Sequence, residues 1–474
     1  MGLIAGAQLM VVLDITIVNI ALPSISRALS INGTSLAWIV DAYTLVFGGL
    51  LLLGGRAGDI FGRRRMFLIG ISIFAGASFL GGLSNSEVTI IAARVIQGIG
   101  GAIASPTALA LIATNFPQGK DRNEALGIVA SVSALGASLG LIFGAVLTQY
   151  LSWRWVFFVN TPVAVVIGIL APRHLKESPK IKVASDIPGS FASVIMIGAL
   201  VYGLINSATY GWTSTVSLVS FVSSVLAAIF FFSYERKHNT PILDLSIFSN
   251  RNRSGSYAIM FLIAAALFSL WFFLTQYLQI VLGYSPLKTG FAFLPMTLTV
   301  MILTKVGAKY VKRVGSMPFL VYGPAAVSVA LFFLGHLGAH SSYLTFVLPI
   351  LLLNATGIAA TFSAVLITVL SGVSQSQAGL ASSMVSVSQQ VGGTLGISIL
   401  VTVSSGFINE TSRQYHVSRG AIGAHALQIL SDMHGWTAGF TAGSIIAFIG
   451  VLVAISSIRR QTELVIVPII GEIA

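Results

Sequence analysis

The sequence contains no cysteine, so disulfide bonds and thiolate metal ligands are excluded. Charged residues are also scarce: Asp, Glu, Lys and Arg make up 8% of the 474 residues, whereas soluble domains contain roughly a quarter. The Gly-x-x-x-x-Gly-Lys-Ser/Thr loop that binds nucleotide phosphates does not occur either. These absences argue against a water-soluble globule and against ATP as an energy source within this chain.

Apolar residues are abundant, because 55% of the chain is hydrophobic and its mean hydropathy is +0.91. About twenty apolar residues cross the hydrocarbon core of a bilayer as a helix, so the sequence predicts an all-α integral membrane protein with about fourteen spans. These are expected at residues 2–22, 36–53, 66–83, 88–115, 125–147, 155–170, 187–206, 216–233, 257–282, 290–310, 318–335, 344–370, 378–407 and 436–455. The first run is too long for a signal peptide and contains Asp14.

The formal charge of +12 could indicate nucleic-acid binding. However, the basic residues do not follow a stripe with interleaved aromatics; they gather in short clusters between the apolar runs. Lys and Arg accumulate in cytoplasmic loops of membrane proteins. The clusters therefore predict a multi-pass protein of the bacterial cytoplasmic membrane with both termini in the cytoplasm, and no nucleic-acid partner.

An internal repeat predicts the domain organisation. A Gly-rich basic segment follows the second expected span at residues 55–62, and residues 308–315 occupy the matching place after the tenth. The sequence thus predicts an N-terminal six-helix half (1–172), a loop with two extra helices (173–253) and a C-terminal six-helix half (254–474). A parallel repeat of this kind places a substrate site between the halves, near the bilayer midplane. We expect a monomer.

Four segments carry a family resemblance: Gly55-Arg56-Ala57-Gly58-Asp59-Ile60-Phe61-Gly62-Arg63-Arg64, Leu13-Asp14-Ile15-Thr16-Ile17-Val18-Asn19-Ile20-Ala21-Leu22-Pro23, Arg94-Val95-Ile96-Gln97-Gly98-Ile99-Gly100-Gly101-Ala102 and Trp153-Arg154-Trp155-Val156-Phe157-Phe158-Val159-Asn160-Thr161-Pro162. The first resembles the cytoplasmic signature of the major facilitator superfamily. The others resemble signatures of the first, fourth and sixth helices of its fourteen-helix drug:proton antiporters. The resemblance implies a major facilitator fold that works by alternating access, similar to methylenomycin-type resistance proteins.

The first of these segments is a candidate gate, formed by Gly55, Arg56, Asp59, Gly62, Arg63 and Arg64. Its glycines allow two helix ends to approach, and Asp59 can pair with Arg63 or with a neighbouring helix terminus. Such a pair would lock the inner gate in one of two states. The alternative is an ordinary positive-inside loop that only sets orientation.

The fifth expected span resembles the antiporter signature Gly-x-x-x-Gly-Pro-x-x-Gly-Gly. Gly136, Gly140 and Gly144 are present, but Leu141 stands in place of the proline and Ala145 in place of the last glycine. Glycines four residues apart still make a smooth helix face for close packing. The missing proline removes the expected kink.

Three ionisable residues within the expected spans are candidates for proton coupling: Asp14, Asp41 and Arg94. A charge at mid-bilayer costs about 2.5–3.5 kcal/mol, so such residues usually have a function and face the protein interior. Burial favours the neutral form of a carboxyl group and a nearby cation favours the charged form. We hypothesise that Asp14 or Asp41 carries the proton and that Arg94 biases its protonation. The alternative is a static Asp–Arg pair that ties the N-terminal helices together.

Aromatic and amide side chains within the expected spans could line a cavity for amphipathic molecules, because such cavities have apolar walls with a few polar groups. The candidates are Trp38, Tyr43, Gln97, Trp271, Gln276, Asn354 and Gln389. For any single aromatic residue, lipid-facing or helix-packing duty is the alternative. His336 and His340 lack an acidic partner nearby, so no metal site is expected.

The function favoured by these features is proton-coupled export of drug-like or antibiotic small molecules, with the proton as coupling ion and no cofactor. The segment Trp38-Ile39-Val40-Asp41-Ala42-Tyr43 resembles the antibiotic-resistance branch of the family more than its sugar carriers. Export of one specific metabolite, such as an amino acid or siderophore, stays open. An embedded enzyme would need a further cluster of catalytic groups, and a channel would not need two repeated halves with gating loops.

Overall fold

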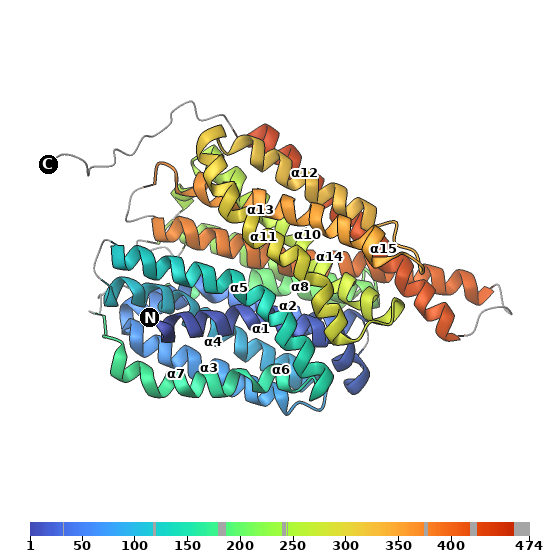
Figure 1. Cartoon of the computed structure of the whole chain (residues 1–474), viewed down its shortest axis with the longest axis horizontal. Helices are drawn as coiled ribbons and strands as arrows, with labels where there is room; N and C mark the ends of the chain where they lie inside the picture. Colours follow the sequence, from blue (N-terminus) through green and yellow to red (C-terminus); the bar gives the residue numbers. More distant parts are fainter. Residues whose placement is uncertain are drawn as a thin grey trace.

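The computed structural model describes the chain apart from residues 32, 117–119, 179–185, 239–242, 244, 374–377, 418–423 and 459–474. Within the described part, all regular structure is helical. Figure 1 shows long helices that lie roughly alongside one another, with the N-terminal helices in the lower part of the view and the C-terminal helices in the upper part. In helices, the backbone amides beyond the first turn bond to carbonyls of the same helix, as a bilayer requires.

The N-terminal helices are α1 (Gly2–Leu29), α2 (Gly33–Phe61), α3 (Arg63–Gly82), α4 (Glu87–Asn115), α5 (Lys120–Tyr150), α6 (Trp155–Phe158) and α7 (Asn160–His174). Two further helices follow, α8 (Ile187–Tyr210) and α9 (Thr215–Glu235). The C-terminal part comprises η1 (Leu245–Phe248), α10 (Arg251–Gln276), η2 (Tyr277–Val281), α11 (Pro286–Val314), α12 (Met317–Leu334), η3 (Tyr343–Val347), α13 (Leu348–Leu370), α14 (Ala378–Val417) and α15 (Ala424–Ser457).

The described residues contain 12 helices long and apolar enough to cross a membrane, or up to 13 if the bent helix α2 counts as one span. The protein is therefore an all-helical, multi-pass membrane protein. The expected number of fourteen is not reached by this measure, because the fifth expected span falls on α5. The apolar part of α5 counted in the described residues, Leu139–Tyr150, is shorter than a span.

Several helices extend beyond the apolar runs, which corrects the expected boundaries. Residues 308–315 were expected to open a loop, yet α11 continues to Val314. Similarly, α14 and α15 cover most of the segment between the last two expected spans. Hydropathy marks the part of a helix that lies in lipid, whereas the helix itself continues as long as its backbone hydrogen bonds do.

Glycines allow close helix crossings in both the N-terminal and the C-terminal helices. A Cβ atom on Gly70 of α3 would lie 2.9 Å from the carbonyl oxygen of Gly100 on α4, and one on Gly323 of α12 would lie 2.8 Å from that of Gly357 on α13. Side chains at these positions would push the helices apart, because real Cβ contacts are longer. Glycine pairs thus permit close crossings of α3 with α4 and of α12 with α13.

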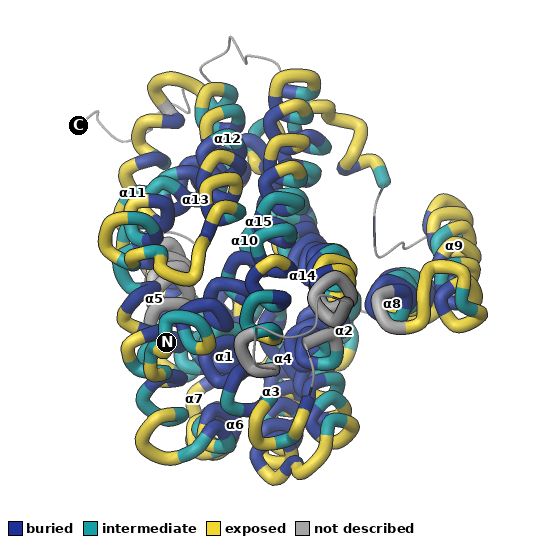
Figure 2. Tube along the Cα trace, turned by 90° about the vertical axis from the view of Figure 1, so that its right-hand side faces the viewer, coloured by how far each residue is buried: buried dark blue, intermediate teal, exposed yellow. Residues whose placement is uncertain are grey.

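The N-terminal and C-terminal helices meet mainly where α2 packs on α14 and α5 packs on α11. At one end of this interface, Gln279 Nε2 donates to the Ile20 carbonyl at 3.0 Å, and Leu287 N donates to Gln149 Oε1 at 3.1 Å. Helices α8 and α9 lie at the side of the bundle, with α8 next to α2 and α14 (Figure 2). Much of α9 is exposed and apolar, which suits a lipid-facing surface.

Candidate functional site

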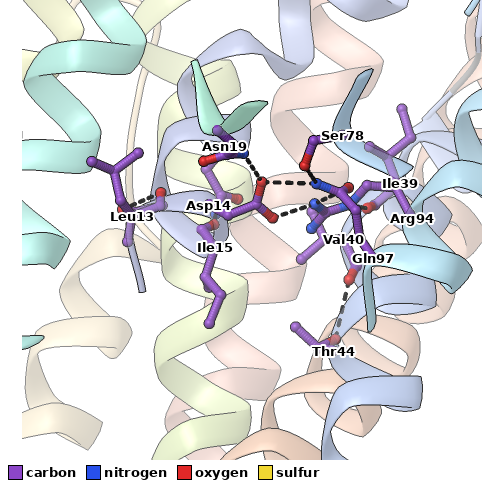
Figure 3. A network of polar contacts seen from close by, with 12 residues as sticks. Leu13, Asp14, Ile15, Asn19, Ile39, Val40, Thr44, Ser78, Arg94 and Gln97 are labelled. Atoms are coloured by element: carbon purple, nitrogen blue, oxygen red, sulfur yellow. Dashed lines mark hydrogen bonds and ion pairs between the residues drawn. The ribbon is translucent and has the colours of Figure 1, made fainter. Parts of the chain in front are cut away.

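A buried polar network joins α1, α3, α4 and α7 inside the N-terminal helices. Figure 3 shows its members Asp14, Ser78, Arg94 and Gln97. Asp14 Oδ2 accepts a hydrogen bond from Arg94 Nη1 at 2.5 Å, and both side chains are no more than 1% exposed. Asp14 Oδ1 accepts from Gln97 Nε2 at 3.1 Å and from Asn160 Nδ2 at 2.9 Å. Gln97 also donates to Ser78 Oγ at 2.7 Å. Both carboxylate oxygens of Asp14 are therefore satisfied by donors.

The Arg94 guanidinium is held from several directions. Its Nε donates to the Ile39 carbonyl at 2.8 Å, its Nη1 also reaches Gln97 Oε1 at 3.0 Å, and its Cζ lies 4.3 Å from the centre of the Tyr43 ring. These acceptors, together with the Asp14 counter-ion, offset the hydration that the cation loses on burial. The geometry brings Asp14 and Arg94 together in a charge pair, as both the coupling hypothesis and the static-pair alternative require.

Asp41 lies apart from this pair, at the contact between α2 and α14. It is fully buried, and Ser398 Oγ of α14 lies 2.9 Å from its Oδ2. The same hydroxyl lies 2.9 Å from the Thr394 carbonyl. Asp41 Oδ1 has no hydrogen-bond partner within the described residues. Asp14 and Asp41 therefore occupy different environments: one carboxyl is fully bonded to a cation and amides, and the other bridges two parts of the chain.

Asp41 contacts one member of a row of hydroxyl groups on α14, which we call the α14 polar stripe: Thr394, Ser398 and Thr402. Residues four apart share a helix face, and all three side chains of the stripe point at other helices. Thr394 Oγ1 lies 2.7 Å from Thr44 Oγ1 of α2, and Thr402 Oγ1 donates to the Leu204 carbonyl of α8 at 2.9 Å. The stripe thus joins α14 to α2 and to α8.

The candidate gate surrounds the junction of α2 and α3. Asp59 and Arg63 form an ion pair at 2.9 Å, and Arg63 Nη1 also donates to the Ala110 carbonyl of α4 at 3.1 Å. Between the two helices, Gly62 has a φ of 104°, a conformation that side chains rarely adopt. The motif expected as a loop is therefore a tight break between helices. Gly55, Arg56 and Gly58 lie on the last turns of α2.

One acid that the sequence reading did not single out completes this junction. The Glu177 carboxylate accepts from the backbone nitrogens of Arg64 at 2.9 Å and Arg65 at 3.0 Å, at the start of α3. Arg64 Nη1 in turn donates to the carbonyls of Pro172 and Leu175, at the end of α7 and just after it. A carboxylate at a helix N-terminus accepts hydrogen bonds from amides that have no partner within the helix. Its negative charge also interacts favourably with the positive end of the helix dipole. These contacts tie the α2–α3 junction to the end of α7.

The three glycines of α5 face α1 closely. A Cβ atom on Gly144 would lie 2.7 Å from the Ile17 carbonyl oxygen, and one on Gly140 would lie 2.9 Å from the Leu13 carbonyl oxygen. At Gly136 the nearest atoms are side-chain tips, Leu9 Cδ1 at 3.1 Å and Val12 Cγ1 at 3.2 Å. The close approach of α5 to the helix that carries Asp14 therefore depends on Gly140 and Gly144 more than on Gly136.

Gly144→Ala is expected to lower the apparent melting temperature of the purified protein, and Gly136→Ala is expected to change it much less. The added methyl group at 144 meets backbone, which cannot rotate away, and overpacking of this kind costs about 1–3 kcal/mol. At 136 the neighbouring side-chain tips can move. Thermal unfolding followed by tryptophan fluorescence measures both. Equal losses for the two variants would contradict this account of the packing.

The expected cavity residues lie on several helices and have different neighbours. Gln97 belongs to the Asp14 network and Tyr43 lies against Arg94. The half-buried Trp38 lies 6.0 Å from the Tyr202 ring of α8. The others are distributed over three C-terminal helices: Trp271 (stacked on Phe293), Gln276 (bonded to the Phe272 carbonyl), Asn354 (fully buried) and Gln389 (half-buried).

Two of the buried amides have atoms without partners, which is rare for buried polar groups. Both amide atoms of Asn354 and Nε2 of Gln390 lack a hydrogen-bond partner within the described residues. Gln390 is on α14, where its Cβ lies 2.8 Å from the position of a Cβ on Gly48 of α2. The α2–α14 contact therefore combines the carboxyl of Asp41, the α14 polar stripe and an amide with free hydrogen-bonding capacity.

Four residues of the Asp14 network, the gate and the Asp41 contact were missed as site residues: Ser78, Asn160, Glu177 and Ser398. Asn160 had a usable signal, because it lies in the Trp153–Pro162 segment that carries the family resemblance. The other three had none. A serine in an apolar run and an acid in a polar loop are common, and only the folded chain shows what they contact.

Comparison with known proteins gives the family. Residues 4–193 and 187–397 match the Major Facilitator Superfamily. The puromycin resistance protein of Streptomyces alboniger is 37% identical over 466 residues, covering 97% of this chain and 91% of that protein. A cephamycin export protein of Amycolatopsis lactamdurans is 33% identical over 403 residues, covering 84% of this chain and 83% of that protein. The methylenomycin A resistance protein of Bacillus subtilis is 31% identical over 393 residues, covering 82% and 84% respectively.

Solved structures agree on the fold. A bacterial homologue of the human lysosomal transporter Spinster superposes with a TM-score of 0.70 at 15% identity, covering 96% of this chain and 95% of that one. The family match and the curated relatives confirm the family resemblance of the sequence motifs and the expectation of a transporter in place of an enzyme. The chain is a member of the Major Facilitator Superfamily, a multi-pass membrane transporter of small molecules related to drug- and antibiotic-resistance exporters.

Proposed function

We propose that the protein exports drug-like or antibiotic amphipathic molecules across the cytoplasmic membrane in exchange for protons, and that Asp41 carries the proton. The observation that carries this proposal is the position of Asp41, a fully buried carboxyl at the contact between α2 and α14. A residue that loads and unloads a proton during alternating access has to meet water as the two halves move, and a position at the contact between the halves provides this. Asp41 meets that requirement, whereas Asp14 is enclosed within the N-terminal helices.

Hydrogen bonding at Asp41 supports a protonated carboxyl in this conformation. The Ser398 hydroxyl has one hydrogen and two acceptors at 2.9 Å, Asp41 Oδ2 and the Thr394 carbonyl. A proton on Asp41 lets the carboxyl donate to Ser398 while Ser398 donates to its own helix. No hydrogen-bond donor within the described residues reaches Asp41 Oδ1, so the charged form would be poorly solvated.

Separation of α2 from α14 would admit water to Asp41 and allow the proton to leave. The charged carboxylate would then attract a cationic or hydrogen-bonding substrate until reprotonation closes the contact. In this scheme the Asp14–Arg94 pair keeps the N-terminal helices rigid as they move, in place of the switching role that the sequence suggested for Arg94. The Asp59–Arg63 pair and Glu177 serve as the gate at the α2–α3 junction.

The remaining features of the transporter follow the same proposal. We take α2 and α5 as full spans, which gives fourteen, arranged as halves 1–172 and 254–474 with α8 and α9 between them. Both termini lie in the cytoplasm, as the basic clusters indicate, and one chain suffices for transport. The substrate class rests on the relatives, whose names refer to puromycin, cephamycin and methylenomycin A.

The test is transport into inverted membrane vesicles that contain the full chain. A pH gradient that is acidic inside the vesicles should drive uptake of puromycin or a lipophilic dye. A proton uncoupler should abolish that uptake. Addition of substrate should release protons from the vesicles. Flux that ignores the uncoupler would reject proton coupling.

Competition separates broad export from export of one metabolite. Structurally unrelated dyes should inhibit puromycin uptake if the cavity accepts amphipathic molecules in general. Absence of both dye transport and dye competition, with uptake of a single amino acid or siderophore, would favour the metabolite exporter.

A further inference from the structure

A pair of buried carboxyl groups joins the two extra helices, on elements separate from those that hold Asp14 and Asp41. Asp186 directly precedes α8, and Glu235 is the last residue of α9; they are 1% and 3% exposed. Asp186 Oδ1 accepts from the Gly189 amide at 2.8 Å, and Glu235 Oε2 accepts from the Leu243 amide at 3.2 Å. One oxygen of each group is thus used to hold backbone.

The other two oxygens face the same small space. A Cβ atom on Gly189 would lie 2.6 Å from Asp186 Oδ2 and 2.6 Å from Glu235 Oε1. The two oxygens are therefore separated by at most twice that distance, and the missing side chain of Gly189 leaves the space between them open. Neither oxygen has a hydrogen-bond partner in the part of the chain that the structure describes. Two buried acceptors face each other without a donor.

Two carboxylates this close cannot both be charged in a buried site, because their repulsion adds to the loss of hydration. One proton removes one charge and supplies the donor that both oxygens lack. The described ionisable group that acts on Glu235 besides Asp186 is His238, which lies in the turn after α9 and favours the charged carboxylate. Arg236 and Lys237 lie in the same turn and are exposed.

We propose that Asp186 and Glu235 share a single proton, and that this acid pair is a pH-sensitive clasp between α8, α9 and the connection that leads to α10. The proton is additional to the one used for transport. With the proton bound, the pair holds the start of α8, the end of α9 and the Leu243 amide together. Loss of the proton leaves two charges that repel, and the clasp loosens.

The sign of the pH dependence follows from proton linkage. The folded pair holds a proton that separate carboxyl groups in an unfolded chain, with pKa values of about 4, have lost at neutral pH. The folded state therefore binds more protons, and its stability falls as the pH rises. The contribution of the acid pair is largest below the unfolded-state pKa of about 4, and it decreases as the pH rises until the folded pair has lost its proton.

Amide substitutions test the shared proton directly. In Glu235→Gln, the amide oxygen can keep the Leu243 contact while the NH2 group donates to Asp186. In Asp186→Asn, the side chain still caps α8, because Asn caps as well as Asp, and its NH2 group donates to Glu235. Each single variant of the full-length protein is expected to melt about 2–4 °C higher than the wild type at pH 8.5, with the difference shrinking towards pH 5.5. The double variant places two NH2 groups face to face and is expected to lose this gain.

Infrared spectroscopy distinguishes a shared proton from a purely structural role. Because Asp41 is also proposed to be protonated, the measurement is a difference spectrum: the wild type is expected to show more protonated-carboxyl C=O absorbance at pH 7 than Glu235→Gln. Glu87→Gln, which removes an acid from the first turn of α4, should leave both this absorbance and the melting profile unchanged. Gly189→Ala fills the space between the oxygens and should lower the melting temperature at every pH.

Two results would overturn the proposal. One is a pair of single variants that are no more stable than the wild type at pH 8.5. The other is stabilisation of the wild type by Na⁺ or Ca²⁺ that Glu235→Gln abolishes, which would show that the two oxygens bind a metal cation in place of a proton. Because neither measurement involves transport, failure of the clasp is distinguishable from failure of proton-coupled export.

Discussion

Asp41→Asn is expected to abolish concentrative, proton-driven transport while leaving the protein folded. Asn has the shape of a protonated Asp and can bond to Ser398, but it cannot release a proton when α2 and α14 separate. One proton crossing 100 mV supplies about 2.3 kcal/mol, which sustains roughly a fifty-fold gradient of a neutral substrate at 1.4 kcal/mol per decade. Without coupling, the accumulation ratio of such a substrate should fall to about 1, since nothing then links its movement to the proton.

Three measurements on reconstituted vesicles check this prediction. Uptake under an imposed pH gradient should be lost, proton release on addition of substrate should be lost, and downhill exchange of labelled for unlabelled substrate should persist. Ser398→Ala is the matched control, because it removes the hydroxyl from the same contact and leaves a titratable carboxyl at position 41. We expect that variant to remain coupled. Concentrative uptake by Asp41→Asn would refute the role of Asp41.

Arg94→Ala is expected to have the largest effect on stability of any single substitution considered. It leaves the Asp14 carboxylate, which is 0% exposed, without its counter-ion, and it also removes the donors to Ile39 and Gln97. Breaking a buried ion pair by removal of one partner costs about 3–5 kcal/mol. Little folded protein should be recovered from membranes, as measured by size-exclusion chromatography of the solubilised chain.

A double-mutant cycle separates the ion pair from the rest of the network. Asp14→Asn with Arg94→Gln replaces both charges by amides that can still bond to each other, so more folded protein is expected than from Arg94→Ala. Arg94→Lys keeps the charge but has no second nitrogen to reach the Ile39 carbonyl as well as Asp14, so partial recovery is expected. A double variant as poorly folded as Arg94→Ala would show that the charge pair is not what holds these helices.

The sequence was sufficient for the family and for the path of most helices. The apolar runs locate most of the observed helices to within a few residues, because hydropathy reports directly on the solvent that a helix meets. The sequence grouped Asp14, Asp41 and Arg94 as candidates for proton coupling. The structure joins Asp14 to Arg94 at 2.5 Å and places Asp41 at a separate contact with Ser398. The sequence predicts about fourteen spans, whereas the described residues contain 12 helices long and apolar enough to span, or up to 13.

Contacts between helices that are distant in the sequence could not be predicted from it. Ser398 lies 357 positions from Asp41, and a serine in a Gly- and Ser-rich helix has no pattern that distinguishes it. The expected cavity residues show the same limitation. Spacing alone put Trp38 on the helix of Asp41, but it cannot tell whether the ring faces a cavity or α8, where it lies against Tyr202. Whether a residue on a helix face lines a cavity or packs on another helix is known only once the neighbouring helix is known.

The hydroxyl groups of the α14 polar stripe have a second acceptor within their own helix. Thr394 Oγ1 lies 3.0 Å from the Gln390 carbonyl, Ser398 Oγ 2.9 Å from that of Thr394, and Thr402 Oγ1 2.7 Å from that of Ser398. When α14 moves away from its neighbours, each hydroxyl can donate to this carbonyl, so no donor is left without an acceptor in a dry environment. The hydrogen bonds of the stripe therefore align the helices when they are in contact. Breaking these bonds adds little to the activation barrier for separating the helices.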